Sequence, residues 1–182
     1  MQRKTLDGFT ITNVGTYDDA QWQKHFESKG EELGDDEGSV QAEGTTPAIS
    51  IRGVNCTVTN CIVHHNGDVG IGVLGKENTT TAPLIANNFV YRNMGGGIDI
   101  AEGAEPIIRG NTFKENLRPG IGCRKANPII SDNVCFQNIR APTDTEGSFL
   151  PMAQWDANNW PSHIHLPRSE QFNSTQTGRT QE

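Results

Sequence analysis

Short apolar segments and Asn or Gly residues recur along the middle of the chain at intervals of 22 to 27 residues. The pattern is clearest when Cys56, Pro83, Pro106 and Pro128 are taken as starting points, with spacings of 27, 23 and 22. Two residues after each start comes an aliphatic residue: Val58, Ile85, Ile108, Ile130. Seven residues after each start comes another apolar residue: Val63, Val90, Phe113, Cys135. Each interval therefore predicts the same succession of short strands.

Asn and Gly occupy fixed places within each interval. Asn stands ten residues after every start, at Asn66, Asn93, Asn116 and Asn138, and also five residues after the last three, at Asn88, Asn111 and Asn133. A Gly-Ile pair stands fourteen residues after the first three starts, at Gly70-Ile71, Gly97-Ile98 and Gly120-Ile121. We expect the Asn residues to lie at corners, where they adopt left-handed backbone and bond to the coils above and below. The Gly residues are expected to ease the next corner.

These repeats predict an all-β fold, a parallel β-helix of about five coils. Each strand is too short to bury a face alone, but coils stacked ~4.8 Å apart share parallel sheets and one core. A leucine-rich repeat is the alternative, but it needs a Leu-rich pattern and a helix in each unit, and neither is evident.

An earlier coil is recognisable in residues 6–13 and 47–51, and an acidic insertion, residues 14–46, separates its two parts. We expect Trp22 and Phe26 to fasten this insertion to the coils and the segment 31–38 to be mobile. The predicted β-helix spans residues 1–138. Residues 139–182 lose the repeat and are expected to form a C-terminal cap or a disordered tail.

Charge and composition narrow the class of partner. The net charge is −7, and residues 14–46 carry all of it, since two Lys and nine acids there give 2 − 9 = −7. No basic stripe exists, so nucleic acid is a poor partner. No apolar run approaches the ~18 residues of a membrane span. The start of the chain lacks the apolar stretch of a signal peptide and any visible cap, so we expect it to be part of a longer protein.

Metal-binding patterns are not evident. The spacing of Cys56, Cys61, Cys123 and Cys135 does not match a metal site, and buried thiols are the expectation. His163 and His165 have the spacing of one edge of a site, but no third ligand is assignable. The sequence therefore predicts no metal site formed by the protein alone.

The units at residues 106–116 (PIIRGNTFKEN) and 128–138 (PIISDNVCFQN) resemble the repeats of the right-handed parallel β-helix proteins of the pectin-lyase-like superfamily. The resemblance covers roughly residues 6–13 and 47–138. It implies a right-handed solenoid. It also implies an activity drawn from polysaccharide lyases, galacturonan hydrolases or alginate epimerases, or a non-catalytic role, because one scaffold hosts many functions.

One outward-facing column contains the first candidate site. Asp99 is predicted to stand beside Ser50, Gly72 and Gly122 on a face cleared of bulky side chains, with Arg52 and Arg124 at its edge. Asp99 with Glu102 would bind a sugar hydroxyl or a Ca²⁺ ion that bridges to a uronate. Arg124 or Lys125 would neutralise the uronate carboxylate or take the proton beside it. Solvated surface charges are the alternative interpretation.

A second outward column, eight residues after each start, contains His64, Tyr91, Lys114 and Phe136. Tyr91 and Phe136 are candidates for sugar stacking or a protein contact, and Lys114 for binding an acidic group. His64 is a further candidate for binding the substrate, and His64 and His65 could be metal ligands or a base. The two are adjacent on a strand, so their side chains are expected to point oppositely and not to share a metal ion.

The sequence therefore predicts a polysaccharide-directed domain, located extracellularly or in a periplasm, that binds or processes an extended acidic glycan in a lateral groove. Paired carboxylates for hydrolysis are not evident, so lyase or epimerase chemistry is favoured if the domain is catalytic. Ca²⁺ is the one cofactor under consideration. The alternative is a non-catalytic scaffold with a protein partner.

Overall fold

The computed structural model of the chain describes residues 4–29 and 46–139, and their strands form three parallel sheets. The first sheet contains β1 (Lys4–Asp7), β4 (Cys56–Thr59), β7 (Leu84–Ala86), β10 (Ile107–Arg109) and β13 (Ile129–Ser131). The second contains β2 (Thr10–Thr12), β5 (Ile62–His64), β8 (Phe89–Tyr91), β11 (Thr112–Lys114) and β14 (Val134–Phe136). The third contains β3 (Ile49–Arg52), β6 (Ile71–Leu74), β9 (Ile98–Ala101) and β12 (Ile121–Arg124).

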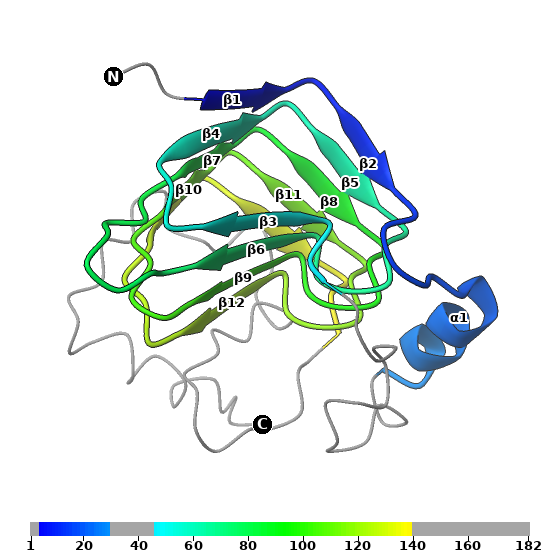
Figure 1. Cartoon of the computed structure of the whole chain (residues 1–182). Helices are drawn as coiled ribbons and strands as arrows, with labels where there is room; N and C mark the ends of the chain where they lie inside the picture. The colour runs from blue at the N-terminus through cyan, green and yellow to red at the C-terminus, as the bar shows by residue number, and fades with distance from the viewer. Residues whose placement is uncertain (1–3, 30–45, 140–182) are drawn as a thin grey trace, which may run out of the picture.

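Successive strands turn around one axis and each coil lies on the previous one, as Figure 1 shows. The described residues give four coils of three strands and two strands of a fifth, so the predicted all-β parallel β-helix is confirmed. The predicted columns are in register, because Val58 pairs with Ile85, which pairs with Ile108. These aliphatic residues are buried in a core that runs the length of the stack.

Two ladders of buried Asn side chains connect the coils. In the first, the side-chain amides of Asn66, Asn93 and Asn116 each donate to the Oδ1 atom of the next Asn, at 2.8 to 2.9 Å, down to Asn138. The second runs in the same way through Asn88, Asn111 and Asn133. Each acceptor oxygen also receives a backbone N–H from the coil before it. The predicted bonding between coils is confirmed.

The left-handed corner positions differ from the prediction by one residue. The residues with positive φ precede the ladder Asn residues: Asn87, Gly110 and Asp132 at one corner, and His65, Arg92, Glu115 and Gln137 at the next. The prediction that the ladder Asn residues themselves are left-handed was wrong. The preceding residue turns the chain, and the Asn side chain is thereby directed into the core, where its amide replaces backbone partners.

The Gly column serves close packing, and no positive φ is found there. A Cβ atom on Gly97 would stand 2.5 Å from both the Gly120 carbonyl oxygen and the Phe113 ring. A Cβ on Gly70 would meet the Val90 side chain at 2.5 Å. The predicted reason for these glycines, conformational freedom at a corner, is therefore wrong. They are needed because the neighbouring coil leaves no room for a side chain.

The insertion carries one helix, α1 (Asp19–Glu27), which lies beside the stack in Figure 1. Asp18 caps it, since its carboxylate accepts the Gln21 N–H at 2.7 Å. Trp22 is buried against Met94, Leu117 and Ile139, and Phe26 stacks on its ring. The predicted role of Trp22 and Phe26 is confirmed, although the sequence analysis did not predict a helix. The predicted mobile segment 31–38 lies outside the described residues, and so does the predicted C-terminal cap or disordered tail, residues 139–182, except for Ile139.

The Asn ladder gives the first testable prediction. Asn116→Ala removes the acceptor for Asn93 and the donors to Asn138 and to the Val90 carbonyl, all of them buried. Each group left without a partner costs about 1–3 kcal/mol, so the free energy of unfolding is expected to fall by at least about 3 kcal/mol. Urea denaturation followed by circular dichroism measures this change.

The matched control is Asn87→Gly at an exposed left-handed corner, where Gly keeps the backbone conformation. Its effect is expected to stay below about 1 kcal/mol. A similar loss of stability in both variants would show that the ladder has no special role.

Candidate functional site

The structure places five of the predicted site residues at one sheet and its adjoining corner. Asp99 lies on β9, Arg52 ends β3 and Arg124 ends β12, while Glu102 and Lys125 occupy left-handed positions directly after β9 and β12. The Arg52 guanidinium lies 3.5 Å from the Glu102 carboxylate. Both side chains are more than half exposed, so this ion pair contributes little stability.

The cleared face predicted around Asp99 is not open at its glycine positions. Ser50, Gly72, Asp99 and Gly122 are in register as predicted, but Gly72 and Gly122 are buried and Asp99 is half-buried. A Cβ on Gly72 would stand 2.6 Å from the Pro47 ring, which covers that position. Burial raises the pKa of the Cys123 thiol to about 11, and the negative charge of Asp99 adds to this effect. The structure therefore shows no continuous open strip along this column.

The remaining predicted residues lie on a different sheet. His64, Tyr91, Lys114 and Phe136 are in register on β5, β8, β11 and β14, and their side chains point outward. They therefore do not share a face with Asp99 and Arg124. On the same strands lies a further outward-facing column, which was not predicted: Thr10, Ile62, Phe89, Thr112, Val134.

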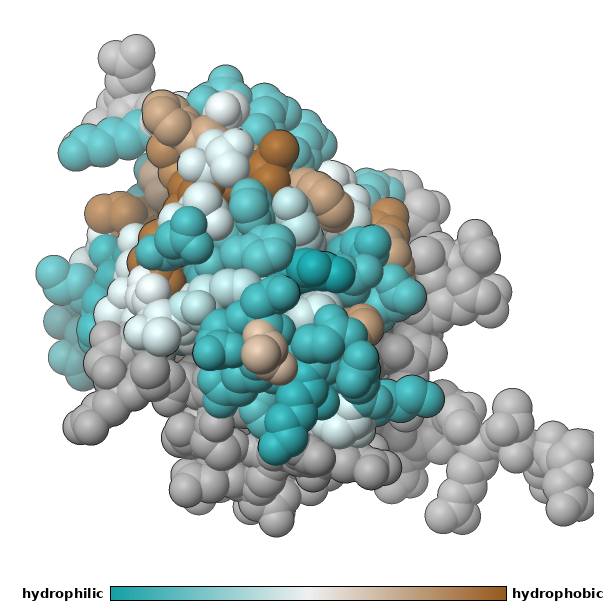
Figure 2. Space-filling view, turned by 90° about the vertical axis from the view of Figure 1, so that its right-hand side faces the viewer, coloured by the Kyte–Doolittle hydropathy of each residue, from teal (hydrophilic) through white to brown (hydrophobic). Residues whose placement is uncertain are grey.

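These two columns make the outer face of the second sheet, which we call the second-sheet face. Ile62, Phe89, Val134 and Phe136 are each between 36% and 40% exposed there. Other described side chains, Phe9, Val54 and Ile129, are more exposed, so it is the grouping of four on one face that is informative. Tyr91 stacks on His64 at 4.9 Å and on Phe89 at 4.6 Å between ring centroids. The Tyr91 ring therefore contacts the rings of His64 and Phe89, while Phe136 lies under the Lys114 ammonium. Figure 2, which faces the side carrying α1, shows hydrophobic residues exposed among hydrophilic ones.

His64 and His65 lie together, contrary to the prediction from strand alternation. Their Nδ1 atoms are 2.6 Å apart and their rings are nearly perpendicular. His65 has a φ of 52°, so the chain has already left the strand conformation and its side chain turns to the same side as His64. The expectation that the two side chains point oppositely was wrong because His65 is a corner residue.

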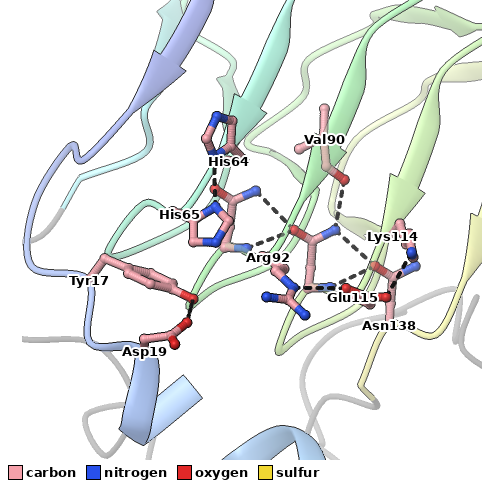
Figure 3. Close-up of polar contacts among 11 residues, drawn as sticks. Tyr17, Asp19, His64, His65, Val90, Arg92, Lys114, Glu115 and Asn138 are labelled. Atoms are coloured by element: carbon pink, nitrogen blue, oxygen red, sulfur yellow. Dashed lines mark hydrogen bonds and ion pairs between the residues drawn. The ribbon is translucent and has the colours of Figure 1, made fainter. Parts of the chain in front are cut away.

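The corner residues after His65 in the stack form an ionic network, drawn in Figure 3. The Arg92 Nε atom donates to Glu115 at 2.9 Å, and Lys114 lies 2.8 Å from the other Glu115 oxygen. The Arg92 guanidinium also lies over the Trp22 ring at 4.6 Å and so connects the network to α1. Glu115 is the more buried partner in both pairs.

The local environment shifts several pKa values. Burial lowers the pKa of His64, and burial with the nearby His64 and Arg92 charges lowers that of His65. Burial would raise the pKa of Glu115, but its hydrogen bonds with Lys114 and Arg92 more than offset this and hold it below its usual value. Burial and the hydrogen bond that Tyr17 donates to Asp19, at 3.0 Å, raise the Tyr17 pKa.

The family model for a right-handed β-helix region matches residues 39–149, more than half of the chain. The chain belongs to this right-handed β-helix family. Searches of curated proteins and of solved structures gave no match. The family description specifies a fold and no activity. The function must therefore be inferred from the side chains of the candidate site.

Two kinds of feature were sought in the described residues: a membrane-spanning helix and a cluster of metal-binding side chains. Among residues 4–29 and 46–139, no helix is long and apolar enough to cross a membrane. In the same residues, no group of three or more His, Cys, Asp or Glu side chains is arranged around a point where a metal ion would fit.

Phe89, Arg92 and Glu115 were not predicted from the sequence as site residues. Phe89 stands two residues before Tyr91, and strand alternation places both on one side, so the signal was present in the spacing. Nothing in the sequence pattern indicated a role for Arg92 and Glu115. Their pairing across neighbouring coils follows from the left-handed corners, which the repeat alone does not reveal.

Glu115 gives a prediction about the pH dependence of stability. Because its pKa is lowered in the folded β-helix, its ion pairs stabilise the fold above the ordinary value of 4.5, and this contribution is lost as the pH falls through the lowered pKa. In Glu115→Gln, the free energy of unfolding is expected to be lower at pH 7 and to fall less steeply below pH 4.5. Urea titrations from pH 3 to pH 7 measure both.

Glu77→Gln, on an exposed turn, is the matched control and is expected to keep the wild-type pH profile. If Glu115→Gln also kept that profile, the Arg92 and Lys114 contacts would contribute nothing to stability.

Proposed function

We propose that this β-helix binds an extended glycan along the second-sheet face. The observation that carries the proposal is the pair of outward columns, in register over five coils, that combine exposed rings with hydroxyl and charged groups. A flat surface that repeats every ~4.8 Å along the axis suits a polymer that lies parallel to that axis.

The chemistry of the columns supports a sugar ligand. Phe89 and Phe136 offer exposed apolar ring surface for the C–H faces of sugar rings. Thr112 stands on β11 between them, and Thr10 and Thr12 lie on β2 at the other end of the sheet. Their hydroxyl groups both donate and accept hydrogen bonds. His64 and Tyr91 extend the same strip and are proposed as further contacts.

An acidic glycan is the favoured class because Lys114 stands on the strip. Its ammonium lies 5.4 Å from the Phe136 ring centroid, so one sugar unit could contact both. The pairing of Lys114 with Glu115 reduces this preference, since a uronate would compete with that carboxylate. Acidic and neutral polymers are therefore compared in the test below. A glycan ligand of this kind would place the protein outside the cell or in a periplasm.

Binding is favoured over processing at this face. The carboxylates that the described residues place beside it, Asp19 and Glu115, are engaged by Tyr17 and by Arg92 and Lys114. Glycoside hydrolysis needs two available carboxyl groups. Lyase or epimerase chemistry, if present, would be proposed for Asp99, Arg124 and Lys125, with Arg52 and Glu102 binding the substrate and Ca²⁺ as the candidate cofactor.

The second candidate is a non-catalytic scaffold that binds a protein on the same face. The exposed apolar side chains Ile62, Val134 and Phe136 favour it, since large exposed apolar residues gathered on one face are typical of interaction surfaces. Binding of a protein partner would depend mainly on the exposed apolar side chains and least on Lys114.

The glycan proposal is tested by affinity electrophoresis in gels containing pectate, alginate or a neutral β-glucan, with and without Ca²⁺. The full chain is expected to be retarded by an acidic polymer. Phe89→Ala combined with Phe136→Ala is expected to weaken binding by roughly 5- to 150-fold, since each ring contact is worth about 0.5–1.5 kcal/mol. Lys114→Ala is expected to weaken binding to the acidic polymers alone.

Asp99→Ala with Arg124→Ala, on the third sheet, is the matched control and is expected to leave retardation unchanged. Loss of binding in that control would move the site to the third sheet, and a rise in ultraviolet absorbance from unsaturated products would establish lyase chemistry. Absence of retardation by every polymer would contradict the glycan proposal and favour a protein partner.

A further inference from the structure

We propose that His64 and His65 form a two-histidine binding site for a divalent transition-metal ion of the Ni²⁺ or Cu²⁺ type, in which solvent supplies the remaining ligands. The inference goes beyond the glycan proposal and does not depend on it. It rests on the convergence of the two Nδ1 atoms at the outer edge of the second sheet.

The backbone creates this convergence. His64 is the last residue of β5, and its side chain points outward. His65 takes the left-handed corner conformation, which in the coils below is taken by Arg92 and Glu115. Two adjacent side chains thus point to the same side of the sheet, as strand geometry alone would not allow. The corner is part of the coil repeat, so the pair is held by the fold itself.

The distance between the two nitrogens is close to what two ligands of one ion need. Metal–nitrogen bonds of ~2.0–2.1 Å that meet at a right angle place the two nitrogens about 2.9 Å apart, and a tetrahedral angle places them about 3.3 Å apart. The observed 2.6 Å requires an adjustment of a few tenths of an ångström for the right-angled arrangement. Square-planar or tetragonal coordination is typical of Cu²⁺ and Ni²⁺, which imidazole also suits.

Neighbouring groups hold both rings. His64 stacks on Tyr91 at 4.9 Å, and the edge of His65 meets Tyr17 at 4.8 Å and Tyr91 at 5.8 Å between ring centroids. Both imidazoles are half-buried, which leaves a path from solvent. Rings that are already oriented lose little entropy when they bind an ion.

The charges nearby act in opposite directions on a cation at the pair, with Arg92 disfavouring it and Asp19 favouring it. Arg92 is the cationic neighbour of His65, but Glu115 accepts its Nε–H at 2.9 Å and offsets its charge. Asp19 contributes a negative charge on the other side of the pair, next to Tyr17. When a metal ion binds Nδ1 of both neutral rings, each ring carries its proton on Nε2.

Isothermal titration of the full, untagged chain with NiCl₂ tests the site. Ni²⁺ is the probe because Cu²⁺ would oxidise accessible thiols, and Cys56 is partly exposed. One ion per chain is expected. Loss of a residue that only orients a metal ligand typically weakens metal binding by roughly 10–100-fold. Loss of a ligand itself, in His64→Gln or His65→Asn, is therefore expected to weaken Ni²⁺ binding by at least that factor. Asn is chosen at position 65 because it tolerates the left-handed backbone.

The matched control replaces the other closely spaced histidines, His163→Gln with His165→Gln, and is expected to leave affinity unchanged. A second measurement does not depend on variants: paramagnetic Ni²⁺ should broaden the nuclear magnetic resonance signals of Tyr17 and Tyr91 before those of residues on the first sheet. If wild type bound no Ni²⁺ at millimolar concentration, or if only the control lost affinity, the contact between the rings would be a hydrogen bond and the metal proposal would be overturned.

Discussion

The stacking of one coil on the next depends on buried Asn side chains that satisfy backbone groups where the strands end. At a corner the chain leaves the sheet, and its N–H and carbonyl groups lose their regular partners. Asn93 and Asn116 bridge this gap because an amide both donates and accepts, so each serves the coil before it and the coil after it. Both are completely buried. A buried polar column of this kind tolerates no slip in register, since a shifted coil would leave the whole row without partners.

The same corners determine which side chains become accessible together. A left-handed residue follows each strand of the second sheet, and its side chain joins the outward side chain of the strand's last residue. His64 with His65 and Lys114 with Glu115 are two such pairs in contact. The candidate glycan contacts and the candidate metal ligands are therefore products of one repeated backbone geometry, filled with different side chains at each level.

The family assignment leaves function to be decided by these outward positions. Within the stack, the core residues and the Asn ladders serve the fold, and any specificity must come from side chains that point away from it. The two outer surfaces discussed above differ in this respect. The third sheet has buried glycines beside Asp99, while the second has exposed rings beside Lys114 and an ordered ionic network. This contrast is why the second sheet is the stronger candidate.

The sequence by itself determined the parallel β-helix, its registers, the inward columns and the ladder Asn residues, because each recurs at a fixed interval and burial allows few residue types there. It also identified Trp22 as the residue that fastens the insertion. It did not determine that His65 turns to the side of His64, that Gly97 lies against Phe113, or that Gly72 is covered by Pro47. Those facts depend on corner conformations and on contacts between residues distant in the chain. Only the folded structure decides them, since a period in the sequence records which residues are equivalent and not which atoms meet.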